Sequence, residues 1–160
     1  MLFIFHFIYS LDNEKKTNAY INNGKINVGW LEWVSFPEYS NFKLKAKIDS
    51  GSQISSLHAT HLNEFVKNGE KWIRFRVCKS DSFMYIEKPI LRFSNIKNSF
   101  GGLQKRPLVL MKISLGKNSW ETDISLTKRS KMNYPMLIGR NTLKEKHLIH
   151  PKRSFVLTKK

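Results

Sequence analysis

The segment Asp49-Ser50-Gly51 places a carboxylate on a tight turn, and this part of the chain is the best suited to chemistry. Glycine has no Cβ to obstruct a sharp turn, and the serine hydroxyl can bond nearby polar groups. Two carboxylates held close together share one proton, because like charges at that distance cannot both ionise. Such a pair supplies an acid and a base at the same pH and can activate water against a peptide carbonyl.

The chain offers a single segment of this D-[ST]-G type. One domain with one such Asp must obtain the second carboxylate from another copy of itself. A two-fold dimer meets this need, because its axis can bring the two copies of Asp49 together. The sequence therefore predicts a homodimer with the active site on the axis.

The residues that lead into Asp49 must form the element that positions it. Phe42, Leu44, Ala46 and Ile48 alternate with three lysines. This alternation is typical of a half-buried strand, in which successive side chains point to opposite faces. Asp49 is thus expected at a strand end.

Two segments resemble the signatures of retroviral proteases. The stretch from Asp49 to Leu57 is similar to their active-site loop, in which D-[ST]-G-A is followed by a short polar run and a hydrophobic residue. The stretch from Leu137 to Leu143 is similar to their second signature, an apolar pair followed by G-R-N and a leucine. In that arrangement Gly139 would let the second apolar strand pack close beneath the loop, with Arg140 as a structural anchor.

A longer stretch resembles the bacterial retropepsin-like peptidases that are often labelled ATP-dependent zinc proteases. Their recurring segments have counterparts here in the same order. These counterparts are Gly29 to Trp33, Lys45 to Gly51, Ser56 to Ala59, Arg106 to Val109, Leu137 to Arg140, and Pro151 to Phe155.

The chain departs from the family pattern at four positions. Ser50, Ser52 and Gln53 stand where the family usually has Thr, Ala and Arg, and His150 stands where Asp is expected. Ser50 keeps the hydroxyl that bonds across the dimer in relatives. In retroviral enzymes the arginine of the second signature pairs with an Asp at the position of Gln53, so Arg140 must find another partner.

The resemblance implies an all-β, retropepsin-like closed barrel with one short helix after the L-I-G-R segment, assembled as a homodimer. It also implies an aspartic endopeptidase in which Asp49 is catalytic, Ser50 and Gly51 support the active-site loop, and no metal or cofactor takes part. Leu137, Ile138, Gly139 and Arg140 form the structural second signature. Relatives are associated with a ligase that adds glutamates to a ribosomal protein, which implies a peptide or protein substrate, such as an acidic, glutamate-rich tail.

The remaining patterns predict how the chain is organised. Residues 1–26 read as an N-terminal extension or linker, and residues 27–160 as the peptidase domain. Strands are expected near Val28 to Phe36, at 54–59, 72–77, 107–115, 120–126 and 136–138, and finally over Ser154 to Thr158. A helical turn is expected within Thr60 to Asn68, and Arg140 to Lys146 is compatible with a helix. Residues 78–105, which include Pro89, Gly101 and Gly102, are expected to carry the flap, a hairpin that closes over substrate.

Composition bounds the class of protein. A chain of 160 residues with 41% hydrophobic content suits one packed domain, and one cysteine leaves no intramolecular disulfide. The net charge of +16 favours encounters with anionic partners such as acidic peptide, nucleic acid, ribosomes or anionic lipid. A Lys- and Asn-rich composition explains the same excess equally well. No nucleic-acid motif stands out, so nucleic acid is the less favoured partner.

The apolar run at residues 1–9 invites comparison with a signal peptide. No Lys or Arg precedes it, the run contains His6 and is interrupted by Asp12 and Glu14, and no small-x-small cleavage site follows. It falls far short of the ~20 apolar residues that span a bilayer. A stray extension, an added edge strand and a degenerate signal of an exported form remain open, and a cytoplasmic location without a membrane span is the favoured interpretation.

Other chemistries fit less well. His58 and His61 are three apart with Ala59 after the first, whereas H-E-x-x-H needs two histidines four apart and a Glu. Neither G-x-x-x-x-G-K-[ST] nor G-x-S-x-G occurs, and Cys78 has no His nearby in sequence. The competing class is a non-catalytic module that keeps the fold and binds acidic protein or RNA through its basic surface.

Overall fold

The computed structural model describes residues 21–158, apart from 23, 41, 80–81, 98–101, 131 and 144–146. Residues 1–20 of the expected extension (1–26) and the glycine at 101 lie outside the described residues. Within them the chain is built almost entirely of strands, with one 3-10 helix, η1 (Pro37–Tyr39), and one short α-helix, α2 (Arg140–Leu143). The predicted all-β class with a short helix after the L-I-G-R segment is confirmed.

Strands of three sheets make up the described structure. Their bounds are β1 (Ile21–Asn22), β2 (Lys25–Gly29), β3 (Leu31–Phe36), β4 (Phe42–Ile48), β5 (Ser55–His58), β6 (Thr60–Lys67), β7 (Glu70–Lys79), β8 (Ser82–Pro89), β9 (Arg92–Lys97), β10 (Leu103–Leu115), β11 (Asn118–Thr127), β12 (Met136–Ile138) and β13 (His147–His150).

The largest sheet closes on itself. Its seven strands run in the order β11-β5-β12-β4-β3-β10-β9, and an additional pairing between β10 and β11 completes a ring. β12 lies between β4, to which it is parallel, and β5, to which it is antiparallel. This order brings residues 48 and 138, far apart in sequence, side by side at the ends of neighbouring strands.

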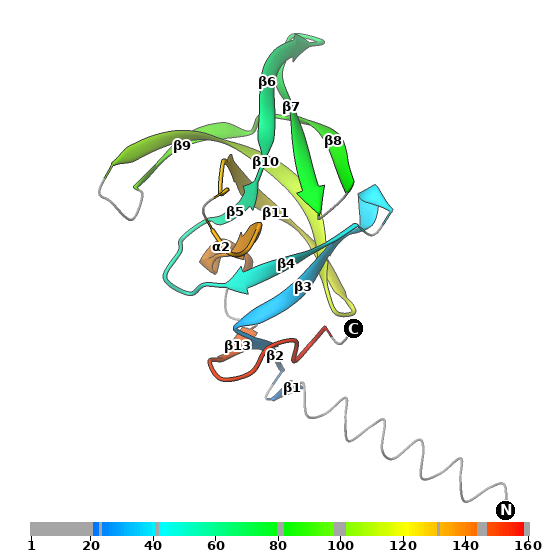
Figure 1. Cartoon of the computed structure of the whole chain (residues 1–160), viewed down its shortest axis with the longest axis vertical. Coiled ribbons are helices and arrows are strands. Elements are labelled where there is room, and N and C mark those ends of the chain that lie inside the picture. Colours follow the sequence, from blue (N-terminus) through cyan, green and yellow to red (C-terminus); the bar gives the residue numbers. More distant parts are fainter. Residues whose placement is uncertain are drawn as a thin grey trace, which may run out of the picture.

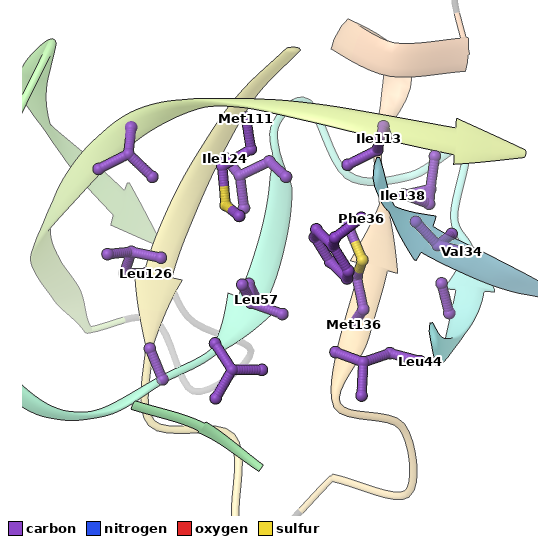
Figure 2. Close-up of a cluster of buried hydrophobic side chains, with 14 of the residues drawn as sticks. Val34, Phe36, Leu44, Leu57, Met111, Ile113, Ile124, Leu126, Met136 and Ile138 are labelled. Atoms are coloured by element: carbon purple, nitrogen blue, oxygen red, sulfur yellow. The ribbon is translucent and has the colours of Figure 1, made fainter. Parts of the chain in front are cut away.

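The side chains that point into this ring form the hydrophobic core. Figure 2 shows them meeting between the strands, and each is at most 2% exposed. Burying one such side chain stabilises the fold by roughly 1.5–3 kcal/mol. The labelled members are Val34, Phe36, Leu44, Leu57, Met111, Ile113, Ile124, Leu126, Met136 and Ile138.

The strand that carries the catalytic candidate has the predicted bounds and faces. In β4, Leu44, Ala46 and Ile48 are buried, while the three lysines between and before them are exposed. The strands β10 and β11 are joined as a tight hairpin. Its two turn residues are Gly116 and Lys117, and Gly116 has a φ of 61°, which a residue with a Cβ rarely adopts.

The predicted helical turn within residues 60–68 is wrong. Residues 60–67 form β6, which pairs with β7 through a two-residue turn at Asn68 and Gly69. Their φ angles of 52° and 79° are the left-handed pair that a type I′ hairpin turn requires, and Asn-Gly is its preferred sequence. β6, β7 and β8 form a separate three-stranded sheet, whose β6–β7 end stands out at the top of Figure 1.

The predicted last strand, Ser154 to Thr158, is also wrong. The final strand is β13, which runs parallel to β2. Residues 156–158 donate their backbone N–H groups to a side chain instead of a neighbouring strand. The predicted first strand is divided into β2 and β3 at Trp30, whose N–H donates to the Arg153 carbonyl.

The stretch predicted to carry the flap contains two strands in its described part, β8 and β9. β9 pairs with the first half of β10, with Leu103 opposite Lys97. In Figure 1 this β9–β10 hairpin sweeps to the left, the side on which β4 ends. The described residues contain no helix long and apolar enough to cross a membrane.

Candidate active site

Asp49 lies at the end of β4, where the chain leaves the sheet. Its N–H donates to the Ile138 carbonyl at 2.9 Å, which ties it to the end of β12. One carboxylate oxygen, Oδ1, accepts the Gly51 N–H at 3.0 Å, and Oδ2 accepts the Ser52 hydroxyl at 3.2 Å. Each oxygen keeps lone-pair capacity beyond these two bonds, since an ionised carboxylate can accept about four. The carboxylate is therefore oriented but not saturated.

Gly139 explains how β12 approaches the loop so closely. A Cβ at this position would lie 2.8 Å from the Ile54 carbonyl carbon and 2.9 Å from the Ser52 carbonyl oxygen. Both are backbone atoms, so a side chain has no room. The backbone then binds the loop twice more, because the N–H groups of Arg140 and Asn141 donate to the carbonyls of Ser52 and Gln53 at 2.8 and 3.0 Å.

The Arg140 side chain takes the loop backbone as its partner. Its Nη1 donates to the carbonyl oxygens of Ser50 at 2.8 Å and Gly51 at 3.0 Å. Gln53 supplies no carboxylate at the position used by retroviral enzymes, and the two carbonyls take its place. A cation thus holds the turn that follows Asp49.

Asn141 has a role that sequence reasoning missed. Its Oδ1 accepts both the Ser55 N–H at 2.8 Å and the Ser55 hydroxyl at 2.9 Å. Its Nδ2 donates to the Asp123 carbonyl at 2.7 Å and the Thr122 hydroxyl at 3.2 Å. One amide therefore links β5, β11 and α2 beneath the active-site loop. The available signal was the asparagine of the G-R-N segment, to which no role was assigned.

All the residues predicted for the site lie in this one region. Leu137 and Ile138 are buried on β12 between β4 and β5, while Ser50 and Gly51 form the exposed turn. The site residues missed by sequence reasoning lie on neighbouring strands and their ends. These are Ser55, Asn141 and Thr142, which bond to one another beneath the loop, and Arg129, which β5 holds beside it, together with Ser52 in the loop itself.

Arg129, directly beyond β11, lies within electrostatic reach of Asp49. Its N–H donates to His58 Nδ1 at 2.7 Å and its Nη1 donates to the Ser56 hydroxyl at 2.8 Å. Burial lowers the pKa of the Arg129 guanidinium, the neighbouring charge of Arg106 lowers it further, and the charge of Asp49 raises it. No sequence pattern marked Arg129, because only the pairing of β5 with β11 brings it to the loop.

His58 has a structural bond that competes with metal binding. Its Nδ1 accepts the Arg129 N–H, and burial, followed by the charges of Arg129 and Lys128, lowers the pKa of its imidazole. His61 is exposed, and its Nδ1 lies 3.2 Å from the hydroxyl of the adjacent Thr60. Within the described parts of the chain, no three His, Cys, Asp or Glu side chains are grouped to hold a metal ion.

A second carboxylate, that of Glu32 on β3, is used in the opposite way. It is fully buried. Its Oε1 accepts the N–H groups of Gly29, Val156 and Leu157 at 2.6, 2.9 and 3.1 Å. Its Oε2 accepts both the N–H and the hydroxyl of Thr158. We call this arrangement the Glu32 clasp, and it fastens residues 156–158 to β2 and β3.

The Glu32 clasp also relates two of the segments that resemble those of bacterial retropepsin-like peptidases. The first, Gly29 to Trp33, supplies the carboxylate, and the last, Pro151 to Phe155, leads into the residues that donate to it. Trp33 stacks on Phe155 with ring centroids 6.0 Å apart and an interplanar angle of 26°. The sequence showed both segments but gave no indication of their contact.

Comparison with known proteins places this geometry in a family. Residues 27–160 match the model of the RimB-like family, described as the retropepsin-like aspartic endopeptidase RimB. A crystal structure of a protein of unknown function from Legionella pneumophila is 29% identical, with a TM-score of 0.74, and the match covers 86% of this chain and all of that one.

Curated relatives carry a different description. Proteins named probable alpha-L-glutamate ligase from Shewanella pealeana and Parasynechococcus marenigrum are each 35% identical, over 88% and 83% of this chain. One from Desulfotalea psychrophila is 32% identical over 78% of this chain. The chain spans about a third of the length of these relatives, at 31%, 29% and 28%. The family match, the shared fold and the loop geometry together show that the chain belongs to the RimB-like family of retropepsin-like proteins.

Proposed function

We propose that the protein is an aspartic endopeptidase that hydrolyses peptide bonds with a water held between Asp49 and the Asp49 of a second copy of the chain. The observation that carries this proposal is the Asp49 carboxylate itself. It is fixed by the Gly51 N–H and the Ser52 hydroxyl and still has lone pairs for a water or a second carboxyl group.

The two carboxyl groups would divide the chemistry between them. One accepts a proton from the water as it attacks the peptide carbonyl, and the other donates a proton to the carbonyl oxygen. The Gly51 N–H and the Ser52 hydroxyl hold each Asp49 carboxylate in one orientation, and Arg140 stabilises the turn that follows it. A fixed geometry of this kind lowers the barrier because the reacting groups need no reorganisation.

The β9–β10 hairpin is our choice for the flap. It is the hairpin within the predicted stretch 78–105 that belongs to the ring sheet, since β9 is the edge strand of that sheet. An edge strand has backbone groups free for an extended peptide, and closing over the peptide would exclude water from the reaction.

The substrate we propose is an acidic, glutamate-rich peptide. Relatives that contain a match to most of this chain are named as glutamate ligases, so a peptide of added glutamates is a chemically coherent target. The formal net charge of +16 would accelerate encounter with such a chain.

Replacement of Asp49 by Asn tests the proposal directly. The variant should form the same dimer and bind a glutamate-rich peptide, but it should lose cleavage by at least about 10³-fold, since the substitution replaces both carboxylates of the symmetric pair with amides that cannot exchange the proton. Peptide cleavage is followed by mass spectrometry and the dimer by analytical ultracentrifugation. A monomeric parent protein, or a variant that cleaves as fast as the parent, would contradict the proposal.

The second candidate is a non-catalytic module, and one surface favours it. On the β6–β8 sheet, Arg74 lies over the ring of Tyr85 at 4.6 Å and Arg76 over that of Phe83 at 5.4 Å. Phe83 and Tyr85 are 60% and 43% exposed. Basic and aromatic side chains together are typical of surfaces that bind single-stranded nucleic acid. If this is the function, the parent protein cleaves no peptide, and its RNA binding weakens steeply as salt rises.

A further inference from the structure

Arg129, which β5 holds next to the active-site loop, and its neighbour Arg106 form no ion pair with a carboxylate of the described residues. The ion pairs among the described residues are Arg74–Glu87, Lys88–Glu38 and Arg92–Asp123, and neither of these two arginines takes part. Resting on the function proposed above, we propose that Arg106 and Arg129 form an anion subsite that binds an acidic side chain of the substrate within about two residues of the bond cleaved.

The pairing of β10 with β11 brings the two side chains together. Leu108 lies opposite Ser125, and continuing that antiparallel register sets Arg106 opposite Thr127, two residues before Arg129. Gln104 links the two strands at this level. Its Oε1 accepts Nε of Arg106 at 2.9 Å and the Thr127 hydroxyl at 3.4 Å.

The environment of both guanidinium groups is unfavourable without an anion. Burial lowers the pKa of Arg106 and of Arg129, and Arg106 lowers that of Arg129 further, while the charge of Asp49 offsets only part of this at Arg129. A guanidinium does not lose its proton in proteins, so the cost of burial and mutual repulsion remains in the folded state. An incoming carboxylate would offset that cost.

The Arg129 side chain also has hydrogen-bonding capacity to offer. A guanidinium carries five N–H donors in a planar fork that matches a carboxylate. Nη1 binds the Ser56 hydroxyl, whereas the buried Nε has no acceptor among the described residues. The unpaired Nε adds to the cost of holding this cation in the folded protein, and an acidic side chain of the substrate would offset that cost by binding the remaining donors of the fork.

The position of Arg129 relates the subsite to the reaction. Arg129 is held by Ser56 and His58 on β5, the strand that follows the active-site loop. The charge of Asp49 reaches its guanidinium. In an extended peptide alternate side chains are about 7 Å apart, so a carboxylate held at Arg129 belongs to a residue close to the scissile bond.

The test compares two quenched fluorescent peptides that differ at the residues flanking the bond cleaved, one with Glu and the other with the isosteric Gln. The parent protein should have a kcat/KM about 100-fold higher for the Glu peptide. In Arg129→Gln and Arg106→Gln the preference should fall to about tenfold or less. Lys117→Gln removes the same charge at the β10–β11 turn, the opposite end of that hairpin from Arg106, and should keep the preference of the parent.

Failure of the inference and failure of the proposed function give different results. If the parent cleaves the Glu and Gln peptides equally well, the subsite is wrong and the peptidase stands. If the parent cleaves neither peptide, the peptidase is wrong. Fluorescence anisotropy of the labelled Glu peptide with Asp49→Asn then tests the subsite alone, and affinity that survives Arg129→Gln in that background overturns it.

Stability measurements separate this subsite from a structural role. Removing one of two repelling cations should leave the melting temperature of Arg129→Gln equal to or above that of the parent. If the true counter-ion is a carboxylate of the second copy, Arg129→Gln should instead shift the dimer toward monomer in the ultracentrifuge. That result, or a lower melting temperature without a change in the Glu preference, overturns the inference.

Discussion

Asp49 and Glu32 are both carboxylates on strands of the ring sheet, yet the fold uses them in opposite ways. Glu32 is fully buried, and five donors surround it, four of them backbone N–H groups. Asp49 is partly exposed and accepts two hydrogen bonds, both from residues of its own turn. The Glu32 carboxylate is saturated by hydrogen bonds within the fold, whereas the Asp49 carboxylate is oriented and can still accept further hydrogen bonds.

The difference shows which acidic residue to assign to chemistry and which to stability. Hydrogen bonds to a charged group are worth about 1.5–3 kcal/mol each, so a saturated carboxylate is a strong structural joint. A catalytic carboxylate must instead keep capacity for water and proton exchange. Exposure and unused lone pairs therefore distinguish the two more reliably than residue type.

Removing the charge of Glu32 and of Asp49 in separate variants tests whether the two carboxylates have different roles. Glu32→Gln should lower the free energy of unfolding by about 3–5 kcal/mol. The NH2 group of the glutamine would face backbone N–H donors, and it cannot accept hydrogen bonds from them. Asp49→Asn should lower it by less than about 1 kcal/mol and should abolish cleavage. Urea unfolding followed by fluorescence measures both. Equal losses of stability would mean that the two carboxylates are not used differently.

A second test concerns the packing beneath the Asp49 loop. Gly139→Ala should lower the free energy of unfolding by about 2–3 kcal/mol, since its Cβ would press on backbone atoms of Ser52 and Ile54. The displaced loop should also lose most of its activity.

Gly69→Ala is the matched control for that test. Gly69 has a φ of 79° and nothing within 4 Å of its Cβ position, so only backbone strain of about 1 kcal/mol is expected, with activity retained. If both variants behave alike, close packing at Gly139 is not what positions the loop.

Replacing Arg140, which binds the turn after Asp49, should have a smaller effect. Arg140→Gln should cost less than about 1 kcal/mol of stability, because the side chain is exposed. Its two bonds to the Ser50 and Gly51 carbonyls would be lost, so kcat should fall about tenfold while KM changes little. Steady-state kinetics with one peptide separates the two parameters. Unchanged kcat would show that the turn holds itself without Arg140.

The smallest expected effect is the pH dependence that His58 adds next to the loop. Its imidazole pKa is lowered in the folded protein below the ordinary value of 6.5, first by burial and then by Arg129 and Lys128. The neutral His58 imidazole therefore makes its full contribution to stability above pH 6.5. That contribution is lost as the pH falls below 6.5, because the unfolded chain binds the proton more tightly than the folded protein does.

His58→Asn keeps an acceptor for the Arg129 N–H but does not titrate. The parent should therefore lose more stability than this variant between pH 7 and pH 5, as measured by thermal unfolding at each pH. Parallel curves would exclude His58 as the source of this dependence.

Sequence reasoning predicted the parts of the fold that depend on local pattern. The alternation over Phe42 to Ile48 gave β4 with its buried face, and the apolar triplet at Met136 gave β12. The Asn68-Gly69 turn was also available in the sequence, but the apolar residues of Thr60 to Asn68 were given a helical interpretation.

Other parts could not be predicted because they depend on contacts between distant segments. Glu32 binds residues more than a hundred positions away, and no spacing rule connects them. Arg129 reaches the loop only because β5 pairs with β11. Sequence patterns identify which residues form a strand but not which remote backbone a side chain will bind.

The Glu32 clasp has a consequence for how the protein is made. Glu32 emerges from the ribosome early, whereas its partners at Val156, Leu157 and Thr158 are among the last described residues to follow. Until then a nascent chain carries an acidic group whose native donors do not yet exist, and β2 and β3 lack the segment that covers them. Contacts of such long sequence separation slow folding, so formation of the Glu32 clasp is expected to be a late step in the folding of this domain.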